Sequence, residues 1–373
     1  VECLYMNLSQ LANSRILDQP VYQPGKPIEQ VAHDYNLNPK DICKLASNEN
    51  PWGASPHAIK AGKEAFKNIH LYPEGSGLVL RSTICKTLGL EPSQIILGNG
   101  SNEIIELLGH VFLEEGDEVI VGEHAFVVYQ LMSLLMGATP IEVPMPDLVH
   151  DLTQMREAIT GRTKLIFLPS PNNPTGTSNS SREIIQFIES LPNHVIFCLD
   201  EAYAEYLESP PDLRPLMKAG KNILAMRTFS KIHGLAGLRI GYGYGNHELI
   251  NLLQKVRQPF NVNSVAQATA MAALEDKEWV IQCRKRNRSG LEQMSAGLEQ
   301  MNLEYVPSEA NFLLIKVGDG HAIFHALQEQ GIITRPMSES LKSFVRISIG
   351  TEEENFKALI ALKKVLEQVK ATQ

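Results

Sequence analysis

Cysteine is scarce in this chain of 373 residues, which contains five, and no two of them form a C-x-x-C pair. Such few and widely spaced thiols exclude a disulfide framework and predict reduced cysteines in the cytoplasm. Long apolar runs are lacking as well, so we expect no membrane helix. The N-terminal residues show no basic region followed by an apolar one, which argues against a secretion signal.

A surplus of positive charge is also missing, because 34 Lys and Arg residues stand against 42 Asp and Glu residues, for a formal net charge of -8. This balance argues against a protein that coats nucleic acid or an anionic membrane. The composition, 43% hydrophobic and 20% charged, is that of an ordinary globular protein and excludes disordered and collagen-like classes. An anionic ligand would have to be bound by a local cluster of donors.

What is present is a regular alternation of strand-like and helical patterns. Predicted strands, several of them apolar at successive positions as in strands buried on both faces, cover residues 94–98, 118–121, 164–168, 194–199, 222–226 and 238–243. Helical patterns at 101–113 and 181–190 lie between them, and the second opens with the capping-box pair Ser180 and Glu183. This alternation predicts an α/β fold with a mostly parallel sheet covered by helices.

The pattern changes after residue 262. A long helix is predicted over 275–301, then strands at 311–317 and 344–349, and a last helix that the capping pair Thr351 and Glu354 opens. The first fifty residues are rich in proline and indicate an arm. We therefore predict an N-terminal arm at 1–46 that belongs to a small domain, a large domain at 47–274, and the rest of the small domain at 275–373.

The most informative stretch is 228–239, which contains Lys231 directly after a predicted strand. Ligands of α/β proteins bind at the carboxyl ends of strands, and a lysine there can form a Schiff base with an aldehyde once its pKa is lowered. The hydroxyls of Thr228 and Ser230 and the guanidinium of Arg239 are donors that suit a phosphate. If each residue is considered alone, Lys231 could instead be an ordinary surface lysine and Arg239 could be paired with a carboxylate.

Two further segments follow predicted strands and are expected at the same sheet edge. Asn173–Gly176, which reads Asn-Pro-Thr-Gly, follows the strand at 164–168, and Asp200–Tyr203, which reads Asp-Glu-Ala-Tyr, follows the strand at 194–199. A buried aspartate can hold a pyridine nitrogen in its protonated form, and asparagine and tyrosine can hydrogen-bond a phenolic oxygen. Each motif alone is more often a turn or a helix cap, so the information lies in their co-occurrence.

The turn Gly98–Glu103 joins a predicted strand to a predicted helix. Its glycines let the backbone approach a phosphate, and the helix N–H groups of Ser101 and Asn102 can bind one with help from the helix dipole. A dinucleotide-binding fingerprint would require a third glycine where Glu103 stands, which disfavours a nicotinamide-dependent dehydrogenase.

Taken in order, these motifs resemble those of the fold-type-I pyridoxal-phosphate enzymes and, within them, the histidinol-phosphate aminotransferases. The resemblance runs from Tyr22 to the C-terminus. It implies a large domain with a mostly parallel sheet plus a small α/β domain, and pyridoxal 5'-phosphate as cofactor. By this likeness the catalytic residues would be Lys231, which would bind the cofactor covalently, Asp200, which would pair with the ring nitrogen, and Tyr203. Asn173 and Tyr203 would both contact the ring oxygen.

The resemblance also implies the residues around the cofactor. Phe126 would stack on the ring face, although an ordinary core position is the alternative for a lone aromatic residue. Tyr72 would reach the cofactor phosphate from the partner subunit, so the active form would be a homodimer with shared active sites. The phosphate would be bound by Ser101, Asn102, Thr228, Ser230 and Arg239.

The substrates implied are a small amino donor and a 2-oxo acid, and the reaction would convert L-histidinol phosphate and 2-oxoglutarate into imidazole acetol phosphate and L-glutamate in histidine biosynthesis. An aromatic amino-acid aminotransferase and a threonine-phosphate decarboxylase share these motifs and stay open. A non-catalytic regulator would need a DNA-binding module, for which the first fifty residues leave too little room. The substrate would be bound by Tyr22, Asn48, Asn173, Arg335 and Arg346.

Two other patterns are interpreted as surface features. His321 and His325 have the spacing of zinc ligands on a helix but no evident third ligand, so no metal site is predicted. The basic run at 284–288 falls within the predicted long helix of an acidic chain and indicates a solvated or interface face rather than a nucleic-acid site.

Overall fold

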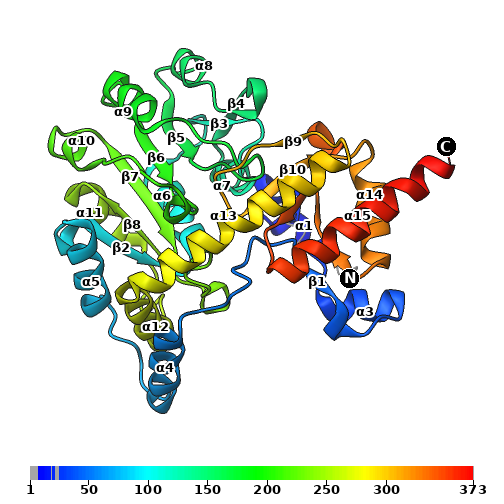
Figure 1. Cartoon of the computed structure of the whole chain (residues 1–373). Coiled ribbons are helices and arrows are strands. Elements are labelled where there is room, and N and C mark those ends of the chain that lie inside the picture. Colours follow the sequence, from blue (N-terminus) through cyan, green and yellow to red (C-terminus); the bar gives the residue numbers. More distant parts are fainter. Residues whose placement is uncertain (1–6, 18, 22–24, 373) are drawn as a thin grey trace, which may run out of the picture.

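A seven-stranded sheet forms the centre of the computed structural model, which describes residues 7–17, 19–21 and 25–372 (Figure 1). In spatial order the strands are β2 (Ile95–Gly98), β8 (Gly241–Gly245), β7 (Ile223–Thr228), β6 (Ile196–Asp200), β5 (Thr163–Pro169), β3 (Glu118–Gly122) and β4 (Thr139–Val143). Strand β8 runs antiparallel to both of its neighbours, whereas the pairs among β7, β6, β5, β3 and β4 are parallel. The prediction of a mostly parallel sheet is confirmed.

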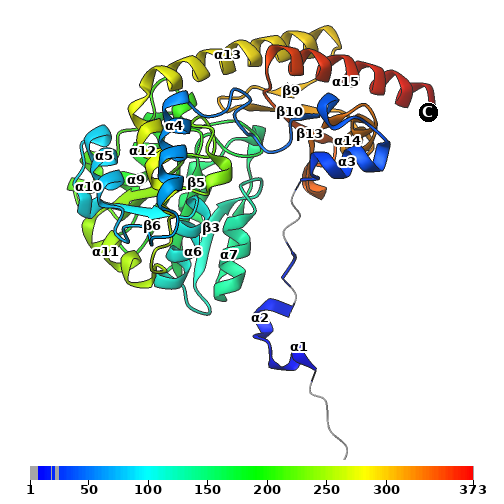
Figure 2. The same ribbon diagram turned by 90° about the horizontal axis from the view of Figure 1, so that it is seen from below.

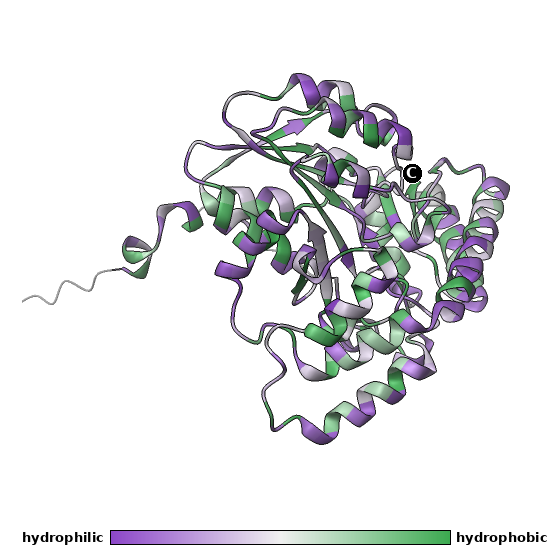
Figure 3. Cartoon of the chain, turned by 90° about the vertical axis from the view of Figure 1, so that its left-hand side faces the viewer, coloured by the Kyte–Doolittle hydropathy of each residue, from purple (hydrophilic) through white to green (hydrophobic). Residues whose placement is uncertain are grey.

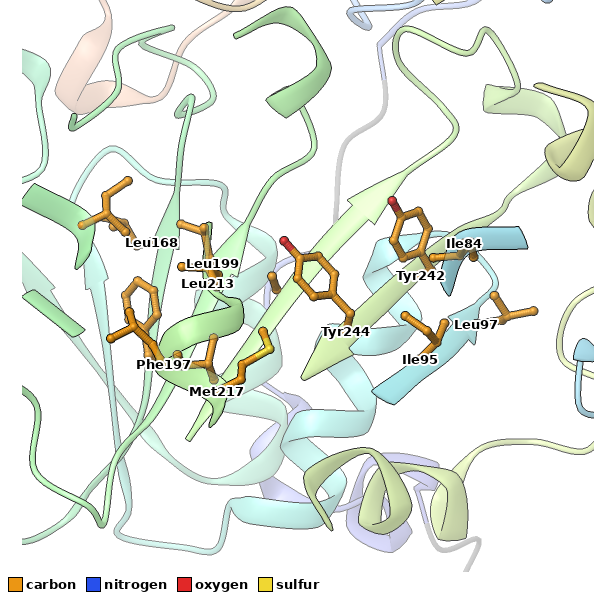
Figure 4. Close-up of a cluster of buried hydrophobic side chains, with 14 of the residues drawn as sticks. Ile84, Ile95, Leu97, Leu168, Phe197, Leu199, Leu213, Met217, Tyr242 and Tyr244 are labelled. Carbon is orange, nitrogen blue, oxygen red and sulfur yellow. The ribbon is translucent and has the colours of Figure 1, made fainter. Parts of the chain in front are cut away.

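Helices cover both faces of this sheet. Alternate residues along a strand accordingly belong to two different hydrophobic clusters, one on each face. Phe197 and Leu199 lie in one cluster, part of which Figure 4 shows, and Cys198 between them lies in the other. Two buried faces explain the continuous apolar runs of the sequence. The helices are α4 (Pro56–Ala65), α5 (Leu78–Leu88), α6 (Ser101–Phe112), α7 (Val128–Met136), α8 (Leu152–Glu157), α9 (Ser181–Ser190), α10 (Arg214–Lys218), α11 (His247–Val256) and α12 (Ser264–Glu275).

Strand β8 has the sequence Gly-Tyr-Gly-Tyr-Gly, in which the two residue types face opposite ways. Tyr242 and Tyr244 pack into the cluster shown in Figure 4. A Cβ atom added to Gly243 would lie 3.3 Å from Ile104 of α6, so the glycine permits close packing of that helix on the sheet. The predicted strand at 238–243 begins too early, because residues 236–238 form a 3-10 turn before β8.

A second, smaller sheet lies beside the first (Figure 1). Its antiparallel strands, in spatial order, are β12 (Arg335–Pro336), β13 (Phe344–Ser348), β10 (Phe312–Lys316) and β9 (Tyr305–Val306). Helices α13 (Lys277–Gln300), α14 (Gly320–Glu329) and α15 (Glu352–Thr372) pack with this sheet in a separate hydrophobic cluster. Figure 2 shows α13 and α15 side by side along one edge of the molecule.

The predicted long helix at 275–301 is interrupted at its start. Asp276 separates α12 from α13, and its side chain accepts a hydrogen bond from the Trp279 N–H at 3.2 Å, as an N-cap does. The capping boxes at Ser180 and at Thr351 form as predicted.

The first fifty residues are more structured than the predicted arm. Helix α3 (Ile28–Tyr35) packs in a small apolar cluster, and β1 (Cys43–Lys44) pairs with β11 (Ile332–Ile333). Proline lies at the helix starts here, where its missing N–H costs nothing, so a proline-rich segment can still contain helices. The short helix α1 (Leu8–Leu11) projects from the body (Figure 2 and Figure 3), whereas α2 (Ser14–Leu17) contacts α7, where the Arg15 guanidinium donates to the Met136 carbonyl oxygen at 2.7 Å. Nothing tests the predicted domain limits, which stay a prediction.

The sheet order brings distant loops together. Segments that follow β2, β7, β6, β5 and β3 emerge at one edge of the large sheet, in that spatial order, and the small sheet lies against them. Among the residues described, no helix is both long enough and apolar enough to span a bilayer.

Candidate active site

A cavity of about 810 Å³ opens at this sheet edge. Its walls come from the loops after the strands of the large sheet, from segment 46–49 and from residues 335–346 of the small sheet. The cavity therefore lies where ligands of α/β sheets bind. The predicted site residues that line it are Asn48, Ser101, Asn102, Phe126, Asn173, Asp200, Tyr203, Thr228, Ser230, Lys231, Arg239, Arg335 and Arg346.

Lys231 points into the cavity from the segment after β7. Its Nζ donates a hydrogen bond to the Ser47 carbonyl oxygen at 3.0 Å and lies 5.6 Å from the centre of the Tyr203 ring. Desolvation, together with the nearby positive charge of Arg346, lowers the pKa of Lys231 to about 8. About a tenth of the amine is thus neutral, and therefore nucleophilic, at pH 7, far more than for an ordinary lysine. The sequence did not indicate the role of the Ser47 carbonyl.

Asp200 ends β6 and is 5% exposed. The Tyr129 hydroxyl donates to Oδ2 at 2.6 Å and the Ala202 N–H donates to Oδ1 at 3.0 Å. Burial raises the pKa of Asp200, and the Tyr129 hydrogen bond opposes that rise. The carboxylate keeps further lone pairs for a cationic N–H in the cavity.

Tyr129 is a site residue that the sequence reasoning missed. It lies on α7, is fully buried, and stacks on Phe167 with ring centres 4.6 Å apart. Phe126, three residues earlier and just before α7 begins, lines the cavity and meets the Tyr129 ring edge-on, with ring centres 5.8 Å apart. No sequence motif marked Tyr129, because its hydrogen bond to Asp200 joins residues 71 positions apart.

Tyr203 and Asn173 each accept a hydrogen bond from another predicted site residue. The Asn48 amide donates to the Tyr203 hydroxyl at 2.9 Å. Arg346 donates from one nitrogen to Asn173 Oδ1 and from another to the Ala46 carbonyl oxygen, the latter at 2.6 Å. The small sheet thereby contacts both segment 46–48 and the loop after β5.

Arg346 and Arg335 are register partners on β13 and β12. Both line the cavity. Like charges directly opposite each other in a sheet are destabilising, so a pair of arginines that faces a cavity indicates an anionic ligand. The spacing of these two residues in the sequence did not show that they would be neighbours, because their proximity depends on the register between β12 and β13.

The N-terminus of α6 and Arg239 form a cradle of donors at the other end of the cavity. Gly100 has a φ of 79°, and a Cβ atom there would lie 2.8 Å from the Arg239 guanidinium. Gly241 is equally constrained, since its Cβ would lie 2.8 Å from the Ser101 backbone nitrogen. Two glycines thus allow α6, β8 and Arg239 to converge around a space that suits a phosphate.

The cavity therefore fits a phosphorylated pyridine aldehyde. Donors for the phosphate lie beside β2, β8 and β7, the buried carboxylate for a ring nitrogen lies at the end of β6, and an amine for the aldehyde lies on the segment after β7. Phe126 and Tyr203 are available for the ring and its oxygen.

One predicted site residue, Tyr72, is not among the described residues that line this cavity. Tyr72 is 83% exposed and stacks on Phe260, with ring centres 4.8 Å apart. Tyr22 lies outside the described residues. His321 and His325 belong to no group of three or more metal-ligating side chains in the part of the chain that the structure describes.

We expect the amine of Lys231 to react with a small aldehyde with a midpoint at pH about 8, because the neutral fraction grows as the pH rises through the lowered pKa. Borohydride trapping at a series of pH values, on protein first freed of any bound aldehyde with hydroxylamine and dialysed, followed by mass spectrometry of the Lys231 peptide, measures this. Exposed lysines in the same digest are the control, since an unperturbed amine titrates near ~10.4. A Lys231 midpoint equal to theirs would contradict the assignment.

The family comparison agrees with this geometry. Residues 40–362 match the family model of aminotransferase class I and II. The histidinol-phosphate aminotransferase of Akkermansia muciniphila is 43% identical over 363 residues, which cover 97% of this chain and 100% of that protein. That of Brevibacillus brevis is 44% identical over 356 residues, 94% of this chain and 97% of the relative.

Solved structures show the same fold. The histidinol-phosphate aminotransferase from Sinorhizobium meliloti, in complex with pyridoxal-5'-phosphate, superposes with a TM-score of 0.87 at 24% identity, over 97% of this chain and 100% of that one. A putative histidinol-phosphate aminotransferase from Erwinia carotovora atroseptica gives 0.84 at 26% identity, over 88% and 97%. The fold-type-I expectation is confirmed, and the chain belongs to the class I and II aminotransferases and, within them, to the histidinol-phosphate aminotransferase family.

Proposed function

We propose that this chain is a pyridoxal 5'-phosphate-dependent aminotransferase that converts L-histidinol phosphate and 2-oxoglutarate into imidazole acetol phosphate and L-glutamate, in histidine biosynthesis. The observation that supports it most is the meeting of an amine, a buried carboxylate and a pair of arginines in one cavity. Full-length relatives named for this activity support the choice of substrate.

The cofactor-binding residues follow from the donor set. Ser101, Asn102, Thr228, Ser230 and Arg239 bind the phosphate, and Phe126 covers one ring face. Asp200, held by Tyr129, accepts the N–H of the ring nitrogen, while Asn173 and Tyr203 bond the ring oxygen. When bound, the cofactor supplies an aldehyde that condenses with amines and a ring that withdraws electrons from the substrate carbon.

Lys231 moves the proton. With the cofactor bound, its neutral Nζ would remove the proton from the substrate carbon that bears the amino group and deliver it to the carbon of the cofactor's aldehyde group, which makes the residue both base and acid. The lowered pKa of about 8 suits this exchange near neutral pH. Tyr203 holds its hydroxyl near the lysine through the Asn48 amide, and the Ser47 carbonyl orients Nζ.

The anionic end of the substrate binds the small-sheet arginines. Arg346 is positioned by Asn173 and the Ala46 carbonyl, and Arg335 lies opposite it. Asn48 and, in the proposal, Tyr22 complete the substrate site. We propose that the arm at 1–46 and residues 275–373 form a small domain that closes on the large domain at 47–274, which would carry Arg346 over the cofactor and exclude water.

We also propose a cytoplasmic homodimer with shared active sites. Apolar side chains that are more than half exposed gather in one short segment of the chain, at Phe66, Ile69, Leu71 and Tyr72. Exposed apolar residues this dense favour an interface. Tyr72 would then reach the partner's cofactor phosphate. The four described cysteines are free and buried, as expected in a reducing compartment.

A substrate panel tests the function. Purified protein with cofactor should form glutamate from 2-oxoglutarate with L-histidinol phosphate, and at least about tenfold more slowly with phenylalanine, which lacks the phosphate that pairs with Arg346 and Arg335. Lys231→Ala should abolish activity and the visible absorption of the bound cofactor. Faster reaction with phenylalanine, or carbon dioxide release from phosphothreonine, would replace the proposed substrate with one of the alternatives.

Complementation between two inactive variants tests the shared site. Lys231→Ala chains mixed with Tyr72→Ala chains should recover about a quarter of the wild-type activity, because half of the randomly assembled dimers are mixed and each has one intact site. The control pairs Lys231→Ala with Arg239→Ala, two residues of the same chain's site, and should recover nothing. Equal results for the two mixtures would rule out the contribution of Tyr72 across the interface.

A further inference from the structure

A small apolar cluster includes Tyr203 and Ile232, the residue that follows Lys231. Ile232 and Cys283 are fully buried in it, Tyr203 and Phe312 meet edge-on at 5.3 Å, and both tryptophans of the chain, Trp52 and Trp279, pack at its side. The cluster thereby joins α13 to the segment that follows Asn48 and to the residue after the reactive lysine.

One face of α13 forms the base of this cluster. Trp279, Cys283 and Arg286 are spaced by four and three residues, which places them in one stripe along the helix. Figure 1 shows α13 crossing from the large sheet toward the small one. Phe312 of β10 and the loop residues Tyr203 and Ile232 therefore pack in one cluster with this helix.

Segment 47–52 links that stripe to the active site. The Asn50 amide donates to the Ile232 carbonyl oxygen at 2.7 Å and lies 3.4 Å from Cys283 Sγ. The Trp52 N–H donates to Asn50 Oδ1 at 3.1 Å. At the other end of the segment, the Ser47 carbonyl accepts from Lys231 Nζ.

Arg286 lies between the two tryptophans. Its guanidinium carbon is 6.0 Å from the Trp52 ring centre and 5.8 Å from that of Trp279, distances at which a cation attracts an aromatic face. The other arginines of the basic run bind elsewhere, Arg284 to the Glu205 carbonyl oxygen and Arg288 to the Glu208 carboxylate. Within the described residues, no carboxylate forms an ion pair with Arg286.

We propose that Arg286 is a positioning residue of the aminotransferase: held between Trp52 and Trp279, it fixes segment 47–52 on α13 and so orients the Ser47 carbonyl and the Asn48 amide toward Lys231 and Tyr203. The inference rests on the proposed function for its kinetic consequence. The stack itself does not depend on that function.

The experiment compares Arg286→Gln with Lys285→Gln, which removes the same charge from the neighbouring exposed position of α13. Because the chain contains only two tryptophans, both in this stack, tryptophan emission reports directly on it. Arg286→Gln should change the emission spectrum and lower kcat about three- to tenfold, with a smaller change in KM, since the reacting groups are misplaced while the arginines that bind substrate are untouched. Lys285→Gln should match the wild type in all three measurements.

Two further variants keep the test decisive. Arg286→Lys keeps the charge without the planar stack and should recover part of kcat. Trp52→Leu removes one ring and should reproduce the kcat loss even if Arg286→Gln folds poorly. A changed emission spectrum with unchanged kcat, KM and cofactor affinity would show a local contact only and overturn the proposal, as would identical results for Arg286→Gln and Lys285→Gln. A wild type without aminotransferase activity would instead refute the proposed function, and emission would still test the stack.

Discussion

The buried carboxylate of Asp200 is the constraint on which the rest of the site depends. An ionised group at the end of a central strand is costly to desolvate unless donors compensate for the lost water. Tyr129 and the Ala202 N–H provide one hydrogen bond to each oxygen. The tyrosine is itself held by stacking on Phe167 of the neighbouring strand β5. The proposed contact with a cationic ring nitrogen would offset more of this cost, because the carboxylate keeps lone pairs that these two hydrogen bonds do not use.

The spatial order of the strands in the large sheet determines the order in which the site residues follow one another along the cavity. The donors that we propose for the phosphate lie beside β2, β8 and β7, the carboxylate follows at β6, and Asn173 follows at β5. Glycine makes the first of these groups possible, because side chains at Gly100 or Gly241 would push Arg239 and α6 apart. The small sheet then adds Arg335 and Arg346 from the opposite side of the cavity. Its register places these two positive charges opposite each other at the wall of the cavity, an arrangement that favours an anionic ligand.

Sequence patterns predicted the strands and their common edge well, because strands buried on both faces leave continuous apolar runs. They failed where burial is partial: β4 was missed, since it is a half-exposed edge strand that contains Pro140. Contacts between distant residues were also beyond reach. Tyr129 and Asp200 are 71 positions apart, and Lys231 and Ser47 are 184 apart. Most of the residues that the family motifs identified line the cavity, whereas residues that contact them, such as Tyr129 and Ser47, had no such signal in the sequence.

The protonation state of the bound cofactor's ring nitrogen tests the central claim most directly. With cofactor labelled with 15N in the ring, the account predicts the chemical shift of a protonated nitrogen in the wild type and of an unprotonated one in Asp200→Asn. Tyr129→Phe should lie between them, because Asp200 would lose a hydrogen bond that favours its ionised form. Equal shifts in the wild type and Asp200→Asn would contradict the account.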